Sequence, residues 1–213
     1  MSSKVRKKIT LEGKIKLVLS SLLVVYSIII SCLTGKLVVT AMLMSFCGDI
    51  YLMKNGNCFN SKREIDFKIG VFMFMISHIV YAGIMNTQMS KTIILIMFII
   101  ASIYMSVVAF GLRNNRIVVA FYVVVLILSV VNTIYFNSIA FAGGILFLIS
   151  DALIGIFDLV RYKKLGRHIW VWGTYVPAQI LLLSSFLIWA KQKQSMIYRL
   201  FLLYLYDKIQ IKL

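Results

Sequence analysis

Two aspartates lie inside long apolar runs, where ionisable side chains are rare. Asp49 stands in MLMSFCGDIYLM and Asp151 in GGILFLISDALIG, and neither run holds a Lys or Arg that could neutralise a carboxylate. At the centre of a membrane helix an Asp costs about 2.5–3.5 kcal/mol, so both should face a bundle interior, one another or a wet cavity. Two such carboxyls can serve as general acid and base. The structural alternative is a pair of protonated carboxyls that hydrogen-bond across helices.

Further polar side chains recur at helical spacing in two other apolar runs. His78 and Tyr81 stand three residues apart, and Tyr175 and Gln179 four residues apart, so each pair shares one helix face. A single intramembrane His is as often a satisfied interior group as a functional one. These four residues are therefore candidates for the surroundings of the carboxyls.

The apolar run around Asp151 carries small residues on the same face. Gly144, Phe147 and Gly155 share that face with the aspartate. Small residues let a neighbouring helix or a ligand approach closely, and plain helix packing explains the glycines equally well. Asp158 shares the face too, but it falls at the end of the run, where a solvated pair with Arg161 is the favoured interpretation.

The elements that must position these side chains are membrane helices. Of the 213 residues 61% are hydrophobic, the mean hydropathy is +0.93 and there is one proline, which together exclude an ordinary soluble domain. The apolar runs are continuous, whereas barrel strands would alternate over about ten residues. We predict an all-α bundle with seven spans, at 15–33, 36–53, 67–85, 92–112, 117–135, 138–160 and 168–190.

The basic residues predict the orientation of the bundle. A net charge of +16 could indicate nucleic-acid binding, but Lys and Arg between apolar runs are topology signals, so no nucleic-acid partner is expected. Sixteen of the 23 Lys and Arg fall on the side of the N-terminus, and only Lys36 and Lys91 lie in the opposite loops. The N-terminus, with its basic tail at 1–14, is therefore predicted to be cytoplasmic. The Ile- and Lys-rich composition suggests a bacterial cell membrane.

The segment 191–213 does not fit the charge rule, because its five basic residues would lie outside if there are seven spans. Residues 195–206 (SMIYRLFLLYLY) are apolar but too short to cross, and Arg199 interrupts them. An interfacial amphipathic helix is favoured, and an eighth span is the alternative. No repeat or linker is visible, so one transmembrane domain over 1–213 is predicted.

Several kinds of chemistry lack their motifs. No Gly-x-Ser-x-Gly elbow, His-Glu-x-x-His or phosphate-binding loop occurs, which argues against serine hydrolase, zinc protease and nucleotide-driven chemistry. Cys32, Cys47 and Cys58 show no Cys-x-x-Cys spacing and are expected to be free thiols. No metal or cofactor is expected.

Four ordered segments, FCGDIYLM, GVFMFMISHIVYAG, GGILFLISDALI and TYVPAQ, resemble the signature segments of the lysoplasmalogenase (YhhN-like) family, over about residues 36–186. The family is one of multi-span membrane hydrolases, usually with eight spans. The resemblance implies cleavage of the vinyl ether bond of a lysoplasmalogen, a lysophospholipid of the membrane, to a fatty aldehyde and glycerophospho-ethanolamine or glycerophosphocholine. It places these residues on the family's polar positions: Gly48, Asp49, His78, Tyr81, Ser150, Asp151, Tyr175 and Gln179.

The implied reaction suits two buried carboxyls. A vinyl ether is hydrolysed by protonation of its β-carbon, which gives an oxocarbenium-like cation that water attacks, so an acid and a base are needed. Asp49 and Asp151 are assigned these roles, with the order left open. Two other functions remain: a proton- or cation-coupled transporter of a small solute, and a non-catalytic lipid-binding protein.

The predicted orientation can be tested by labelling Cys58, which stands in the loop 54–66 between the second and third runs. An impermeant thiol reagent added to intact cells should leave Cys58 unmodified, whereas a permeant reagent should label it. Labelling by the impermeant reagent would place this loop outside and reverse the topology.

Overall fold

A computed structural model of the chain describes residues 11–55, 64–85, 87, 90–109, 115–159 and 167–210. The all-α prediction is confirmed, because these residues form seven helices and no strand. The helices are α1 (Leu11–Thr34), α2 (Val38–Asn55), α3 (Glu64–Met85), α4 (Ser90–Ala109), α5 (Asn115–Ile134), α6 (Ser138–Leu159) and α7 (Arg167–Gln210).

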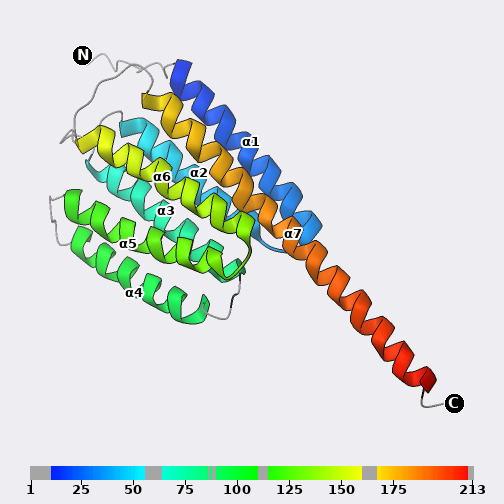
Figure 1. Cartoon of the computed structure of the whole chain (residues 1–213). Helices are drawn as coiled ribbons and strands as arrows, with labels where there is room; N and C mark the ends of the chain where they lie inside the picture. The colour runs from blue at the N-terminus through cyan, green and yellow to red at the C-terminus, as the bar shows by residue number, and fades with distance from the viewer. Residues whose placement is uncertain are drawn as a thin grey trace, which may run out of the picture.

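Six of the helices form a closed ring, and α4 lies outside it (Figure 1). Going round the ring, α1 contacts α2, α2 contacts α3, α3 contacts α5, α5 contacts α6, α6 contacts α7, and α7 returns to α1. The larger helix contacts of α4 are with α3 and α5 only. The buried apolar residues follow the same division, since one cluster draws on all six ring helices and a second joins α3, α4 and α5.

The outer surface of the bundle is apolar, as lipid requires. Large hydrophobic side chains are exposed along the helices, among them Val18 and Leu22 on α1 and Leu95 and Phe98 on α4. Within the described residues, α1, α3 and α7 contain stretches long and apolar enough to cross a membrane, and the other four helices contain shorter apolar stretches. A bundle with lipid-like side chains outside and polar side chains inside is the arrangement of a membrane protein.

Glycines bring two pairs of helices into close contact. A Cβ on Gly48 of α2 would lie 2.7 Å from the ring of Phe74 and 3.1 Å from the carbonyl oxygen of Gly70 on α3. A Cβ on Gly143 of α6 would lie 2.9 Å from the backbone nitrogen of Leu182 on α7. These small residues set the distance between backbones in the ring.

Two connections at the end of the bundle opposite the start of α1, those from α1 to α2 and from α5 to α6, are short and capped. The helix α1 ends in Gly35, whose φ of 66° is the left-handed conformation typical of a helix C-terminus, and its N–H donates to the carbonyl of Ser31 at 3.0 Å. Asn137 begins α6, because its Oδ1 accepts the backbone N–H of Ala140 at 2.8 Å. These caps fix where the neighbouring helices start and end.

The last helix is longer than predicted. The expected span at 168–190 continues without a break to Gln210, through Pro177, so α7 has 44 residues and extends beyond the bundle (Figure 1). Residues 191–210 are therefore helical, as both alternatives for this segment require, and they continue α7 without a break. Their location at the membrane surface stays a prediction. Cys58 and most of the loop 54–66 lie outside the described residues.

The contact at Gly143 can be tested by adding one methyl group. Gly143→Ala forces the new Cβ against backbone atoms of α7, which cannot rotate away as a side chain would, and should destabilise the bundle by about 1–3 kcal/mol. The matched control is Gly173→Ala, whose Cβ would meet no atom within 4 Å and should be neutral or stabilising. Thermal unfolding in detergent measures both, and equal unfolding temperatures would contradict the close packing.

Candidate active site

Asp49 is buried in the ring and held by two hydroxyl groups. It lies on α2 with 7% of its surface exposed. Ser20 Oγ of α1 donates to its Oδ2 at 2.7 Å, and the Tyr175 hydroxyl of α7 donates to the same oxygen at 3.1 Å. Two donors on one oxygen stabilise a negative charge at this position.

Asp151 has one hydroxyl partner and is partly exposed in the isolated chain. It lies on α6, and its Oδ2 accepts a hydrogen bond from the hydroxyl of Tyr122 on α5. Ring contacts connect Tyr122 with Tyr175, the partner of Asp49, because the ring centroids lie 6.1 Å apart for Tyr122 and His78, 4.8 Å for His78 and Phe147, and 5.5 Å for Phe147 and Tyr175. The two carboxyls and their tyrosine partners therefore belong to one cluster of side chains. Within the described residues the two carboxyls share no hydrogen-bond partner.

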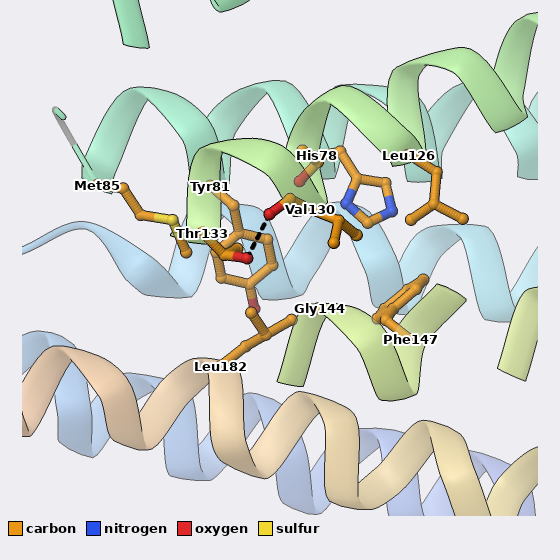
Figure 2. A pocket seen from close by; sticks show the side chains of 10 residues that line it. His78, Tyr81, Met85, Leu126, Val130, Thr133, Gly144, Phe147 and Leu182 are labelled. Carbon is orange, nitrogen blue, oxygen red and sulfur yellow. Dashed lines mark hydrogen bonds between the residues drawn. The ribbon is translucent and has the colours of Figure 1, made fainter. Parts of the chain in front are cut away.

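His78 lies beside this cluster on α3. Its ring centroid is 4.8 Å from that of Phe147, in an edge-to-face contact, and 6.1 Å from that of Tyr122. Only 3% of the residue is exposed, and its Nε2 atom has no hydrogen-bond partner within the described part of the chain. The ring borders a small cavity between α3, α5, α6 and α7 (Figure 2).

The cluster draws one side chain from every helix of the ring. The six are Ser20 of α1, Asp49 of α2, His78 of α3, Tyr122 of α5, Asp151 of α6 and Tyr175 of α7. The outer helix α4 contributes none of these contacts. The ring therefore encloses the cluster, and we call these six residues the polar cluster.

Two further predicted residues pair with each other next to the cluster. The Tyr81 hydroxyl of α3 donates to Gln179 Oε1 of α7 at 3.2 Å, and both residues are buried. Gln179 Nε2 has no hydrogen-bond partner among the described residues. On α7, Gln179 follows Tyr175 by one helical turn, so the structure does bring together the residues that share this face.

The remaining predicted residues lie in helix contacts. Gly48 contacts α3, as described above, and Ser150 Oγ donates to the backbone carbonyl of Val171 on α7 at 3.2 Å. Both neighbour a carboxyl in sequence and set the position of its helix. Gly144 faces Thr133 of α5, and the side chain of Asp158 lies outside the described residues.

Sequence reasoning missed Ser20 and Tyr122, each of which donates directly to a carboxyl. Neither has a distinctive pattern, because Ser and Tyr are common in membrane helices and both stand in ordinary apolar runs. The sequence indicated only that buried Asp49 and Asp151 need hydrogen-bond donors, which a polar group on a neighbouring helix such as a hydroxyl can supply. Which hydroxyl does so depends on the rotation of α1 and α5.

A cation and an aromatic ring lie on the N-terminal side of the cluster. Lys16 stands one helical turn before Ser20 on α1. Its Nζ lies 6.0 Å from the ring centroid of Trp172 on α7. The arrangement leads from the end of the bundle where α1 begins towards the buried carboxyls. Within the described residues no group of His, Cys, Asp and Glu could hold a metal ion.

The family resemblance is confirmed by comparison with known proteins. The model of the YhhN family matches residues 13–186, which is most of the chain. The protein therefore belongs to the YhhN family, a family of lysoplasmalogenase-like membrane proteins. Comparison with curated proteins and with solved structures gave no match. The matched region contains the whole polar cluster.

The hydrogen bond between Ser20 and Asp49 should couple the effects of their substitutions on the free energy of unfolding. In a double-mutant cycle with Ser20→Ala and Asp49→Leu, we expect an interaction energy of about 0.5–3 kcal/mol, because the serine loses its acceptor once the carboxyl is gone. Ser21→Ala is the matched control, since Ser21 is exposed and donates to Leu17 of its own helix. Unfolding in mixed detergent micelles gives the free energies. Equal coupling of both serines to Asp49 would contradict the contact.

Proposed function

We propose that the protein hydrolyses the vinyl ether bond of lysoplasmalogens, with Asp49 and Asp151 as its catalytic carboxyls. The observation that carries the proposal is the polar cluster: two carboxyls from different helices, each held by hydroxyl groups inside an apolar ring and connected through the ring contacts of their tyrosine partners. Family membership supports the same class of reaction. Such a site suits a substrate that is itself a membrane lipid.

The first step is transfer of a proton to carbon. A carboxylic acid protonates the β-carbon of the vinyl ether, the double bond becomes a single bond, and the positive charge is shared between the α-carbon and the ether oxygen. We assign this proton to Asp151, because it is the more exposed carboxyl and receives one hydroxyl donor where Asp49 receives two, so its charged form is the less stabilised of the two.

The second carboxyl stabilises the cation. Asp49 receives two hydroxyl donors on one oxygen, which favours its charged form, and an ionised carboxylate lowers the energy of a neighbouring oxocarbenium ion. Glycoside hydrolases stabilise a similar cation with a carboxylate, which is an analogy of chemistry and not of fold. Tyr175 and Ser20 would hold Asp49 in place.

Water completes the reaction. Its oxygen bonds to the α-carbon and its proton passes to the carboxylate that Asp151 has become, which restores the acid. The resulting hemiacetal breaks its carbon–oxygen bond to the glycerol, the hydroxyl proton moves to that oxygen, and the products are a fatty aldehyde and a glycerophospho-alcohol. All atoms of the lipid and one water are accounted for.

In this proposal the lipid lies with its phosphate at the end of the bundle where α1 begins. In the proposed orientation Lys16 and Trp172 are at the cytoplasmic end, where a lysolipid presents its phosphate. The vinyl ether follows the glycerol by a few atoms, so the carboxyls one or two helical turns deeper would reach it. The hydrocarbon chain would then extend between the helices towards the middle of the bilayer.

Two other functions make different demands on the same residues. A proton-coupled transporter also needs intramembrane carboxyls, but it would move a solute and release no aldehyde. A non-catalytic lipid-binding protein would keep the fold and tolerate the loss of either carboxyl.

Conservative substitutions separate catalysis from packing. Asp49→Asn and Asp151→Asn keep size and hydrogen bonding but cannot exchange a proton, so release of aldehyde from lysoplasmalogen should fall at least about a hundredfold in each. Yield and thermal stability in detergent should stay near those of the wild type. The control is Asp66→Asn on α3, which makes none of the contacts of the polar cluster and should keep full activity.

Each rival predicts a different pattern in this experiment. If the carboxyls only hold helices together, both Asn variants should keep the wild-type rate. A transporter should release no aldehyde in any variant, the wild type included. Near-full hydrolysis by either Asn variant removes that aspartate from the mechanism.

A further inference from the structure

His78 carries a buried polar atom that the mechanism above does not use. Its Nε2 has no hydrogen-bond partner within the described residues, although only 3% of the residue is exposed. Burying such an atom unsatisfied costs about 1–3 kcal/mol. A ring in this position is therefore expected to hydrogen-bond to something that enters the bundle.

The cavity beside the ring defines what can enter. Its volume is about 10 Å³, which is the space needed by one water molecule and far less than a hydrocarbon chain requires. Figure 2 shows the imidazole of His78 between Leu126 and Val130 of α5, above Phe147 of α6. We call this space the His78 chamber. Its lining residues are His78, Tyr81, Met85, Leu126, Ser129, Val130, Thr133, Gly144, Phe147 and Leu182.

The chamber offers a water more than one hydrogen-bond partner. Besides His78 it is lined by Tyr81, Ser129 and Thr133, each of which carries a hydroxyl group. The Thr133 proton is donated to the carbonyl of Val130 at 2.6 Å and the Tyr81 proton to Gln179, so both oxygens can accept from a water. A bound internal water usually makes two to four such bonds, and the remaining walls are apolar.

The chamber also lies near the tyrosine that holds the carboxyl assigned to act on water. The His78 ring is 6.1 Å from the ring of Tyr122, whose hydroxyl holds Asp151. Phe147, which contacts His78 edge-on, precedes Asp151 by one turn of α6. Two residues that line the chamber therefore adjoin the Asp151 half of the polar cluster, His78 through its contact with Tyr122 and Phe147 through its place on α6.

We propose that the His78 chamber binds the water that attacks the oxocarbenium carbon, and that His78 is the residue that positions this water. This inference rests on the proposed hydrolysis of vinyl ethers. The water's oxygen bonds to the α-carbon, its proton passes to ionised Asp151, and His78 keeps its own proton throughout. The role requires a hydrogen-bonding atom at Nε2, and it requires the volume of the chamber.

Two variants remove the water by different routes. His78→Phe removes the hydrogen bond, whereas Gly144→Ala fills the chamber, because its Cβ would lie 3.0 Å from Thr133 Oγ1 and 3.5 Å from Val130 Cγ2. Gly83→Ala on α3 is the matched control, since its Cβ would only touch Ile94 at 3.8 Å. His78→Gln places an amide near Nε2 and should restore positioning without proton exchange.

Steady-state kinetics and isotope effects should then separate positioning from packing. In both damaged variants kcat should fall about ten- to a hundredfold with KM little changed, and His78→Gln and Gly83→Ala should keep most activity. Wild-type hydrolysis should slow in D₂O because proton transfer to carbon limits its rate. In the damaged variants this ratio of rates should change, because attack of water replaces proton transfer to carbon as the limiting step. An unchanged isotope effect, or full activity in Gly144→Ala, overturns the proposal.

A structural readout keeps this proposal separate from the proposed function. A high-resolution map of the wild type should show solvent density within hydrogen-bonding distance of His78 Nε2, and the Gly144→Ala map should not. A chamber without such density in the wild type overturns the water site even if the enzyme is active. If the density is present but the wild type releases no aldehyde, the proposed reaction fails and the attacking role fails with it.

Discussion

The hydrogen bonds to Asp49 are the constraint on which the site depends. An ionisable carboxyl inside an apolar ring is tolerated only where donors surround it, and here α1 and α7 supply Ser20 and Tyr175 to a single oxygen. These donors come from the first and the last helix of the chain. For both to reach Asp49 on α2, α1 must pack against α2 and α7 and so close the ring. The same contacts that satisfy the carboxyl therefore determine which helices are adjacent.

The glycine contacts serve the same end. Gly48 lets α2 approach α3, and Gly143 lets α6 approach α7, so the two carboxyl-bearing helices are each drawn tightly to one neighbour. With those pairs fixed, Asp49 and Asp151 belong to one polar cluster although 102 positions separate them in the sequence, from 49 to 151. The helix α4 can pack on the outside because the ring closes without it.

Much of this could be predicted from the sequence, and the rest could not for definite reasons. Hydropathy gave the helices to within a few residues, since apolar length is a strong signal in lipid. The end of α7 was not predicted because Lys191 and Lys193 mark the end of the apolar run. Charged residues end a membrane span, but they do not end a helix. Asp49 and Asp151 could be identified from the sequence because an ionisable side chain inside an apolar helix is energetically costly. Their donors could not, because the rotation of α1 and α5 is set by packing across the ring.

The central claim is that a carboxyl of this bundle protonates the β-carbon of a vinyl ether, and the position of a deuterium label tests it most directly. Purified protein in detergent would hydrolyse a lysoplasmalogen in D₂O, and the aldehyde would be reduced at once to the alcohol and analysed by mass spectrometry. A reaction with Asp49→Asn gives the background. The account predicts a single deuterium on the carbon next to the former aldehyde carbon. Aldehyde without deuterium there, or no aldehyde above background, would contradict it.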